Sequence, residues 1–120
     1  MDLTELDVET MNVRRRAKSA VIGKWRITEM GLWDTDYLDM VEPAYIHFQS
    51  NGLGKFKFGC VTGGLDCDLS RDDAEFTWQG HDEMDPVSGA GWAEIHEDGT
   101  LTGEISFHLG DESTFTARRW

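Results

Sequence analysis

Residues 93–109, which read AEIHEDGTLTGEISFHL, decide the fold. Apolar side chains occupy every second position on both sides of Glu97-Asp98-Gly99, and this period of two is typical of a strand with one dry face. A three-residue loop with its glycine in a left-handed conformation joins antiparallel strands through a bulge. Such a loop at residues 97–99 sets Ile95 opposite Leu101. The stretch therefore predicts an antiparallel hairpin.

The same alternation continues through the chain from Gly23 onward. It marks eight expected strands, each apolar on one face and polar on the other. The expected inward residues, strand by strand, are Trp25 and Ile27; Ile46 and Phe48; Phe56, Phe58 and Cys60; Leu65, Cys67 and Leu69; Phe76 and Trp78; Ala93 and Ile95; Leu101, Gly103, Ile105, Phe107 and Leu109; and Phe115 and Ala117.

Three further turns test the register, because a slip of one residue turns every side chain to the wrong face. The expected pairs are Ile46 opposite Phe56 across Ser50-Asn51-Gly52, Cys60 opposite Cys67 across a two-residue Gly63-Gly64 turn, and Phe107 opposite Phe115 across a loop of residues 110–112. In each hairpin the apolar faces agree. We expect an all-β, eight-stranded antiparallel up-and-down meander, closed into a barrel because closure removes sheet edges. An open or split sheet is the alternative.

Residues 1–22 have a different pattern and are expected to form an N-terminal amphipathic helix or tail ahead of a barrel domain at residues 23–120. Acidic residues fill the first half of this segment and the basic residues of 14–18 the second, which suits a helix dipole. Two interpretations stay open: a solvated helix, or a basic end that docks on the acidic body or on a partner. Its apolar residues recur at spacings of three and four, at Leu3, Leu6, Thr10, Val13, Ala17 and Ala20.

The net charge of -12 limits the partners of this protein. The acidic and basic residues of the first eighteen positions cancel, so the excess lies in the rest of the chain. A negative body repels nucleic acid and anionic lipid, and we expect neither direct nucleic-acid binding nor membrane binding. The chain opens MDLTELD, with no basic and apolar pattern of a signal peptide. We expect a cytoplasmic protein whose two cysteines stay reduced, although opposed Cys60 and Cys67 would lie within disulfide range.

Gly23-Lys24-Trp25 resembles the Gly-X-Trp signature of the calycins, the lipocalin and avidin group of barrels. This resemblance implies that an arginine late in the last strand, Arg118 or Arg119, covers the ring of Trp25 by cation–π contact. Residues 25–30 (WRITEM) and 81–86 (HDEMDP) also resemble a group of small uncharacterised bacterial proteins. No activity is known for that group, so the likeness assigns no functional residue.

Acidic residues gather in connections that a meander places at one end of the barrel. Odd-numbered connections share an end, and here these are residues 31–43, 63–64, 80–91 and 110–112. Trp33 and Tyr37, with Met84 and Trp92 nearby, add aromatic and apolar surface. The predicted binding residues are Trp33, Asp34, Asp36, Tyr37, Asp39, Glu42, His81, Asp82, Glu83, Asp85, Asp111 and Glu112.

This loop end predicts a non-enzymatic binding or regulatory domain for a cationic partner or ligand, since carboxylates and aromatic rings both attract cations. Candidates are a basic protein segment, a polyamine-like molecule or Ca²⁺; simple solvated loops are the alternative. No zinc spacing, phosphate loop or nucleophile elbow occurs, so we expect no catalytic residue, resident metal or cofactor. The oligomeric state stays open.

Two other functions remain as alternatives. One is a calycin-like carrier of a small apolar molecule, which needs an internal cavity. The inward aromatic residues would fill most of an eight-stranded barrel, which argues against it. The other is a hydrolase or lyase that uses the His81–Asp85 segment for acid–base chemistry.

Overall fold

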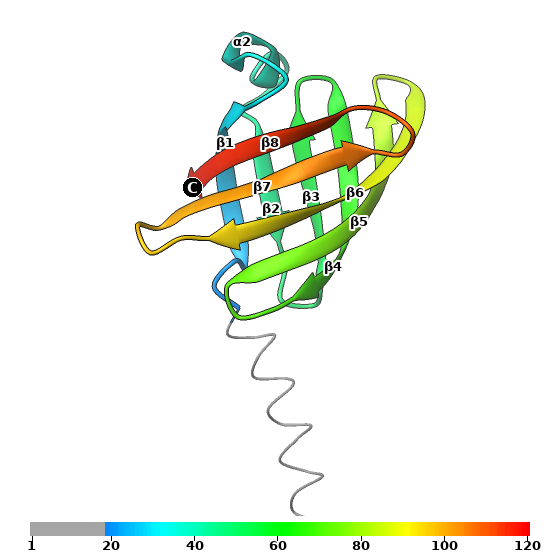
Figure 1. Ribbon diagram of the computed structural model, residues 1–120. Helices are drawn as coiled ribbons and strands as arrows, with labels where there is room; N and C mark the ends of the chain where they lie inside the picture. The colour runs from blue at the N-terminus through cyan, green and yellow to red at the C-terminus, as the bar shows by residue number, and fades with distance from the viewer. Residues whose placement is uncertain (1–18) are drawn as a thin grey trace, which may run out of the picture.

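The computed structural model describes residues 19–120 and shows a closed barrel of eight antiparallel strands in chain order (Figure 1). The predicted fold class is therefore confirmed. Of the expected N-terminal helix or tail over residues 1–22, residues 1–18 lie outside the described residues, and residues 19–22 form a turn in which the N–H of Ile22 donates to the carbonyl of Ser19. The elements are β1 (Gly23–Met30), α2 (Thr35–Leu38), β2 (Tyr45–Phe48), β3 (Leu53–Phe58), β4 (Val61–Leu69), β5 (Asp73–Asp82), β6 (Asp85–Ile95), β7 (Thr100–Phe107) and β8 (Glu112–Arg119).

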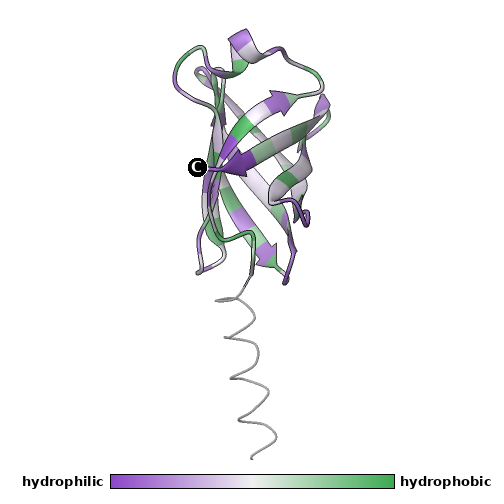
Figure 2. Ribbon diagram, turned by 90° about the vertical axis from the view of Figure 1, so that its left-hand side faces the viewer, coloured by the Kyte–Doolittle hydropathy of each residue, from purple (hydrophilic) through white to green (hydrophobic). Residues whose placement is uncertain are grey.

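The strands β5–β8 cross the front of the barrel at a large tilt to β1–β4 behind them (Figure 1). Hydrophilic and hydrophobic residues alternate along the strands, as the period of two requires (Figure 2). The inward side chains fill the interior. The largest fully buried ones are Trp25, Phe48, Phe56, Phe58, Phe115, Ile27, Leu38, Ile46, Leu101 and Ile105.

The barrel closes where β8 pairs with β1, and an arginine secures this closure. The Arg119 guanidinium lies 3.9 Å from the ring of Trp25 and donates to the carbonyls of Ala20 and Ile22 at 2.8 and 2.7 Å. Trp25 Nε1 donates to the carbonyl of Val21 at 2.8 Å. The contact that the calycin resemblance implied is present, and Arg119 makes it. We call Trp25, Arg119 and the backbone of residues 20–22 the closing seam.

Two predicted turns are confirmed. Gly52 and Gly99 have φ of +85° and +87°, in the left-handed region that glycine adopts without steric cost. The register places Ile46 opposite Phe56 and Ile95 opposite Leu101.

The predicted Gly63-Gly64 turn is wrong. The chain reverses at Gly59-Cys60, where Gly59 has φ of +55°, and Gly63 lies inside β4 opposite Phe56. Space explains this placement, because a Cβ on Gly63 would come within 2.6 Å of the Phe56 ring. Cys60 therefore does not face Cys67, and both thiols are free and partly buried.

The predicted loop over residues 80–91 is also wrong. β5 continues to Asp82 and β6 begins at Asp85, so only Glu83 and Met84 form the turn. Glu83 adopts φ of +56° there. Residues 85–91 resemble a loop in sequence because most of them are small or polar, yet they form more than half of β6, which has 11 residues.

The last hairpin has a different register from the predicted one. Phe115 lies opposite Gly103 rather than Phe107, a slip of four residues. A Cβ on Gly103 would come within 2.7 Å of the Phe115 ring, so the ring occupies space that only glycine leaves free. The turn falls at residues 108–110 instead of 110–112, and Leu109, expected inside, is 95% exposed with φ of +57°.

None of the helices described in residues 19–120 has the length and apolar character needed to cross a membrane.

Candidate functional site

The first connection, expected as an open loop, contains the short helix α2. The Asp34 carboxylate caps it by accepting from the backbone N–H of Tyr37 at 3.2 Å. The connection is tied to the β3–β4 turn, since the N–H of Gly59 donates to the carbonyl of Leu38 at 2.8 Å. Asp34, one of the predicted binding residues, thus has a structural role.

Trp33 and Tyr37 cover this end of the core. The Trp33 ring centroid lies 5.1 Å from that of Phe58 and 6.1 Å from those of Phe107 and Tyr37. The Tyr37 hydroxyl accepts from the N–H of Cys60 at 3.4 Å. Both side chains are only half-exposed, because packing uses much of their surface.

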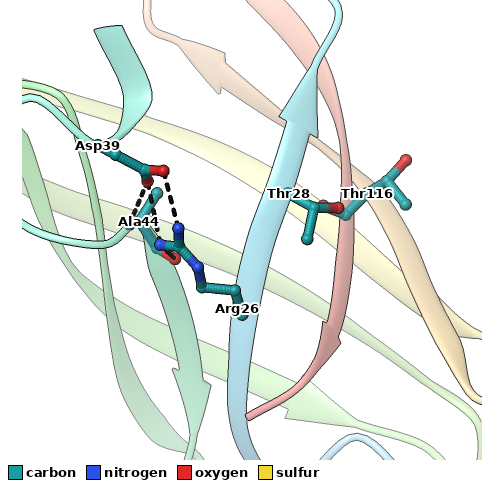
Figure 3. A network of polar contacts seen from close by, with 5 residues as sticks. All are labelled: Arg26, Thr28, Asp39, Ala44 and Thr116. Atoms are coloured by element: carbon teal, nitrogen blue, oxygen red, sulfur yellow. Dashed lines mark hydrogen bonds and ion pairs between the residues drawn. The ribbon is translucent and has the colours of Figure 1, made fainter. Parts of the chain in front are cut away.

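Asp39 turns back from the loop toward the barrel and meets Arg26 (Figure 3). The two guanidinium N–H groups donate to its two oxygens at 2.7 and 3.0 Å, and Oδ1 also accepts from the N–H of Ala44 at 2.9 Å. These hydrogen bonds to Arg26 and then Ala44 lower the pKa of Asp39. Within residues 19–120 this is the one ion pair, and it fastens the first connection to β1.

The structure does bring the first connection close to the β5–β6 turn. Burial raises the pKa of Tyr37 first, and the negative charges of Asp82 and Glu83 raise it further. Burial likewise raises the pKa of the Cys60 thiol, with additional effects from the same two carboxylates. Asp82 lies opposite Asp85 at the end of the hairpin.

The other predicted residues remain on the surface. Asp36, Glu42, Asp111 and Glu112 are exposed, and His81 projects from the outer face of β5 between Thr62 and Pro86. Within residues 19–120, no group of three His, Cys, Asp or Glu side chains is placed to hold a metal ion.

A groove on the outer face of β4–β7 was missed by sequence reasoning. Thr77, Ala90 and Ser106 contribute small side chains to it, so its floor is shallow and open. Its acidic part is lined by Asp66, Cys67, Asp68, Glu75, Phe76, Thr77, Ala90, Gly91, Trp92, Glu104 and Ser106. It continues toward the odd-connection end past Gln79, Ser88 and His108.

The acidic residues of this groove surround an exposed tryptophan. Trp92 on β6 lies opposite Glu75 on β5 and opposite Glu104 on β7, and it is 41% exposed. Asp68 in turn lies opposite Glu75. We call Asp66, Asp68, Glu75, Trp92 and Glu104 the acid wall.

Like charges directly opposite each other destabilise an antiparallel pair. The acid wall contains one such pair, Asp68 and Glu75, and the next row of the sheet adds a second, Asp73 and Glu94. Among the described residues, no basic side chain forms an ion pair with any of these carboxylates. The arrangement therefore lowers stability and favours a cation at this face.

Behind the groove, Cys67 lies on the inner face of β4, opposite Phe76, and packs against the core. Its half-buried position raises its pKa to about 11, chiefly through burial and then through the negative charge of Asp66. A thiol with this pKa remains protonated at neutral pH and is a poor nucleophile. The groove therefore offers binding groups rather than a covalent catalyst.

The sequence contains a signal for the acid wall, because its residues occupy the polar, outward positions of strands in which polar and apolar residues alternate. The composition of residues 80–91 predicts a loop, and a loop does not define whether Trp92 points into or out of the barrel. The predicted turns also define no register for β4 with β5 or for β5 with β6.

No family model matches this chain, and no curated protein or solved structure is similar to it.

Proposed function

We propose that this protein is a non-enzymatic binding domain that recognises a cationic partner, such as a lysine- or arginine-rich protein segment, on the acid wall. The single observation that carries the proposal is the position of Trp92 between Glu75 and Glu104.

Strand spacing gives this arrangement its affinity for cations. Neighbouring strands lie about 4.8 Å apart, so a carboxylate stands on each side of the indole ring. An ammonium or guanidinium group over the ring gains cation–π attraction and has two carboxylates within reach. It also offsets the repulsion between Asp68 and Glu75, which supplies a reason for binding beyond general attraction to a negative surface.

The shape of the groove suits an extended segment. Thr77, Ala90 and Ser106 leave its floor open across the outer face of three strands, and Glu75, Trp92 and Glu104 form the next row at its acidic end. A chain lying there places successive basic side chains against successive acidic rows.

The loop end predicted from sequence supports the same function less well. Trp33 and Tyr37 pack on the core, Asp34 caps α2, and Asp39 is engaged by Arg26. The filled interior gives no support to a small-molecule carrier, and His81 has Thr62 and Pro86 beside it instead of a second catalytic group. The proposal places the protein in the cytoplasm, where free thiols persist.

A labelled lysine-rich peptide tests the proposal by fluorescence anisotropy. We expect binding that weakens steeply with salt, because the attraction is electrostatic. The double variant Glu75→Gln/Glu104→Gln should weaken binding by about tenfold. Trp92→Leu should weaken it by roughly threefold at unchanged charge, which isolates the ring's contribution.

The matched control is Asp36→Asn/Glu42→Gln, which removes the same charge from the loop end. Unchanged binding by this control supports the acid wall. An equal loss in both double variants means that the peptide senses only net charge, and a loss confined to the control assigns the site to the loop end. Either result contradicts the acid wall.

A further inference from the structure

Within residues 19–120, the positive charges are concentrated on the wall of the barrel formed by β8, β1, β2 and β3. Residues 19–120 contain seven basic side chains, and five of them lie on this outer face. Of the other two, Arg71 lies in the β4–β5 turn and Arg119 covers Trp25. We call the five the basic wall: Lys24, Arg26, Lys55, Lys57 and Arg118.

The register arranges the basic wall in two rows that cross the strands. In one row Arg118 lies opposite Arg26, Arg26 opposite Tyr45, and Tyr45 opposite Lys57. The other row runs Lys24, His47 and Lys55. Each row thus has a ring-bearing side chain from β2, Tyr45 or His47, between basic side chains of β1 and β3.

The aromatic rings hold the cations in place. Lys24 Nζ lies 4.7 Å from the ring centroid of Tyr45 and 4.3 Å from that of Trp120. Arg26 lies 5.8 Å from the ring of Trp120. Cation–π attraction of this kind favours the positions that Lys24 and Arg26 occupy on the wall.

Within residues 19–120, four of the five basic side chains form no ion pair. Only Arg26 forms an ion pair, with Asp39. Arg26 and Arg118 stand directly opposite each other. Like charges so placed repel, and an anion bound across the rows would relieve the repulsion.

We propose that the basic wall is a second interaction surface, which binds an extended acidic segment of a partner protein. Alternate side chains of an extended chain are about 6.6 Å apart, which is also the separation of Lys55 from Lys57 and of Lys24 from Arg26 along their strands. Carboxylates at every second position of the partner therefore match both pairs.

Charge distribution disfavours the other anionic partners. Four strands span only about 15 Å, and past that width a nucleic acid meets the acidic remainder of the barrel. Lys24 Nζ lies over the rings of both Tyr45 and Trp120 and so competes with a base for stacking on them. A second copy of this chain carries the same net charge of -12, and two such copies repel.

This inference goes beyond the proposed function, because it gives the barrel one face that binds cationic partners and another that binds anionic partners. With both walls occupied, the protein joins a basic partner to an acidic one.

The test uses a labelled short peptide that alternates Glu and Thr, and full-length protein. We expect saturable binding that Lys55→Gln/Lys57→Gln weakens by about tenfold. Lys55→Gln alone should weaken it by about threefold, whereas the matched control Arg71→Gln, with the same change in charge outside the wall, should leave it unchanged. Thermal melting of each variant shows whether the fold is intact.

Equal losses for Lys55→Gln and Arg71→Gln would overturn the proposal, since net charge alone would then explain binding. Tighter binding of a single-stranded oligothymidine of equal length would replace the acidic peptide with nucleic acid. Absence of peptide binding at low salt by a folded protein would remove the surface altogether.

Discussion

The closing seam and the acid wall differ in whether their charged side chains have partners within the fold. At the seam, Arg119 covers Trp25 and its N–H groups donate to two backbone carbonyls. On the acid wall, Glu75 and Glu104 flank an exposed ring without a basic partner among the described residues. A charge that is fully satisfied by the fold serves the fold, and a charge that the fold leaves unsatisfied is available to a partner.

The largest expected effect breaks the seam. Trp25→Ala removes the fully buried ring beneath Arg119 and should lower the free energy of unfolding by about 4 kcal/mol. Urea denaturation followed by circular dichroism measures this loss. A loss below about 1 kcal/mol would mean that the seam does not close the barrel energetically.

The next effect separates the inner from the outer side of β4. Gly63→Ala should cost about 2 kcal/mol, because its Cβ would stand 2.6 Å from the Phe56 ring and 2.9 Å from the Trp78 ring. Gly64→Ala is the matched control, with its nearest atom, the Gln79 carbonyl oxygen, at an ordinary 3.7 Å. Equal melting temperatures for the two variants would contradict the assigned faces.

A smaller effect follows from the paired carboxylate of Asp39. Because its pKa is lowered in the folded state, its stabilising contribution is present above the ordinary pKa near 3.8 and is lost as pH falls through the lower folded value. Asp39→Asn should cost about 0.5 kcal/mol at pH 7, since the pair is largely exposed and screened by solvent. The difference between the two proteins should vanish in acid, which denaturation at several pH values checks.

The smallest effect has the opposite sign. Glu75→Gln relieves repulsion from Asp68 and should raise the free energy of unfolding by about 0.3 kcal/mol at low salt. The gain should shrink as salt screens the charges. A loss of stability would show that Glu75 already has a favourable partner in the fold.

The barrel architecture was predictable from the period of two, because a residue stays on the inward face when the predicted register is wrong by an even number of residues. Phe115 slipped by four residues and still points inward, since an even slip keeps a side chain on its face. The turns at Gly52 and Gly99 were predictable because left-handed glycine is a local requirement. The positions of Gly63 and Gly103 were not predictable from the local sequence. Each glycine leaves room for an aromatic ring from a neighbouring strand, which is a long-range requirement.

The candidate surfaces were harder to foresee than the strands. Grouping by odd connections correctly gathered Tyr37, Asp82 and Glu83. It did not show that Asp39 would turn toward Arg26, because side-chain direction depends on how α2 seats against the β3–β4 turn. Both walls depend on cross-strand neighbours, such as Glu75 with Trp92, which only the complete register defines.

The two native thiols have a practical consequence for chemical labelling. Burial raises the pKa values of both Cys60 and Cys67, so each thiol is less reactive toward a maleimide than an ordinary exposed cysteine. A cysteine introduced at an exposed position such as Ala90 or Thr62 would react first in the wild-type background. Fluorophores for energy transfer between the two faces can therefore be attached without first removing native residues.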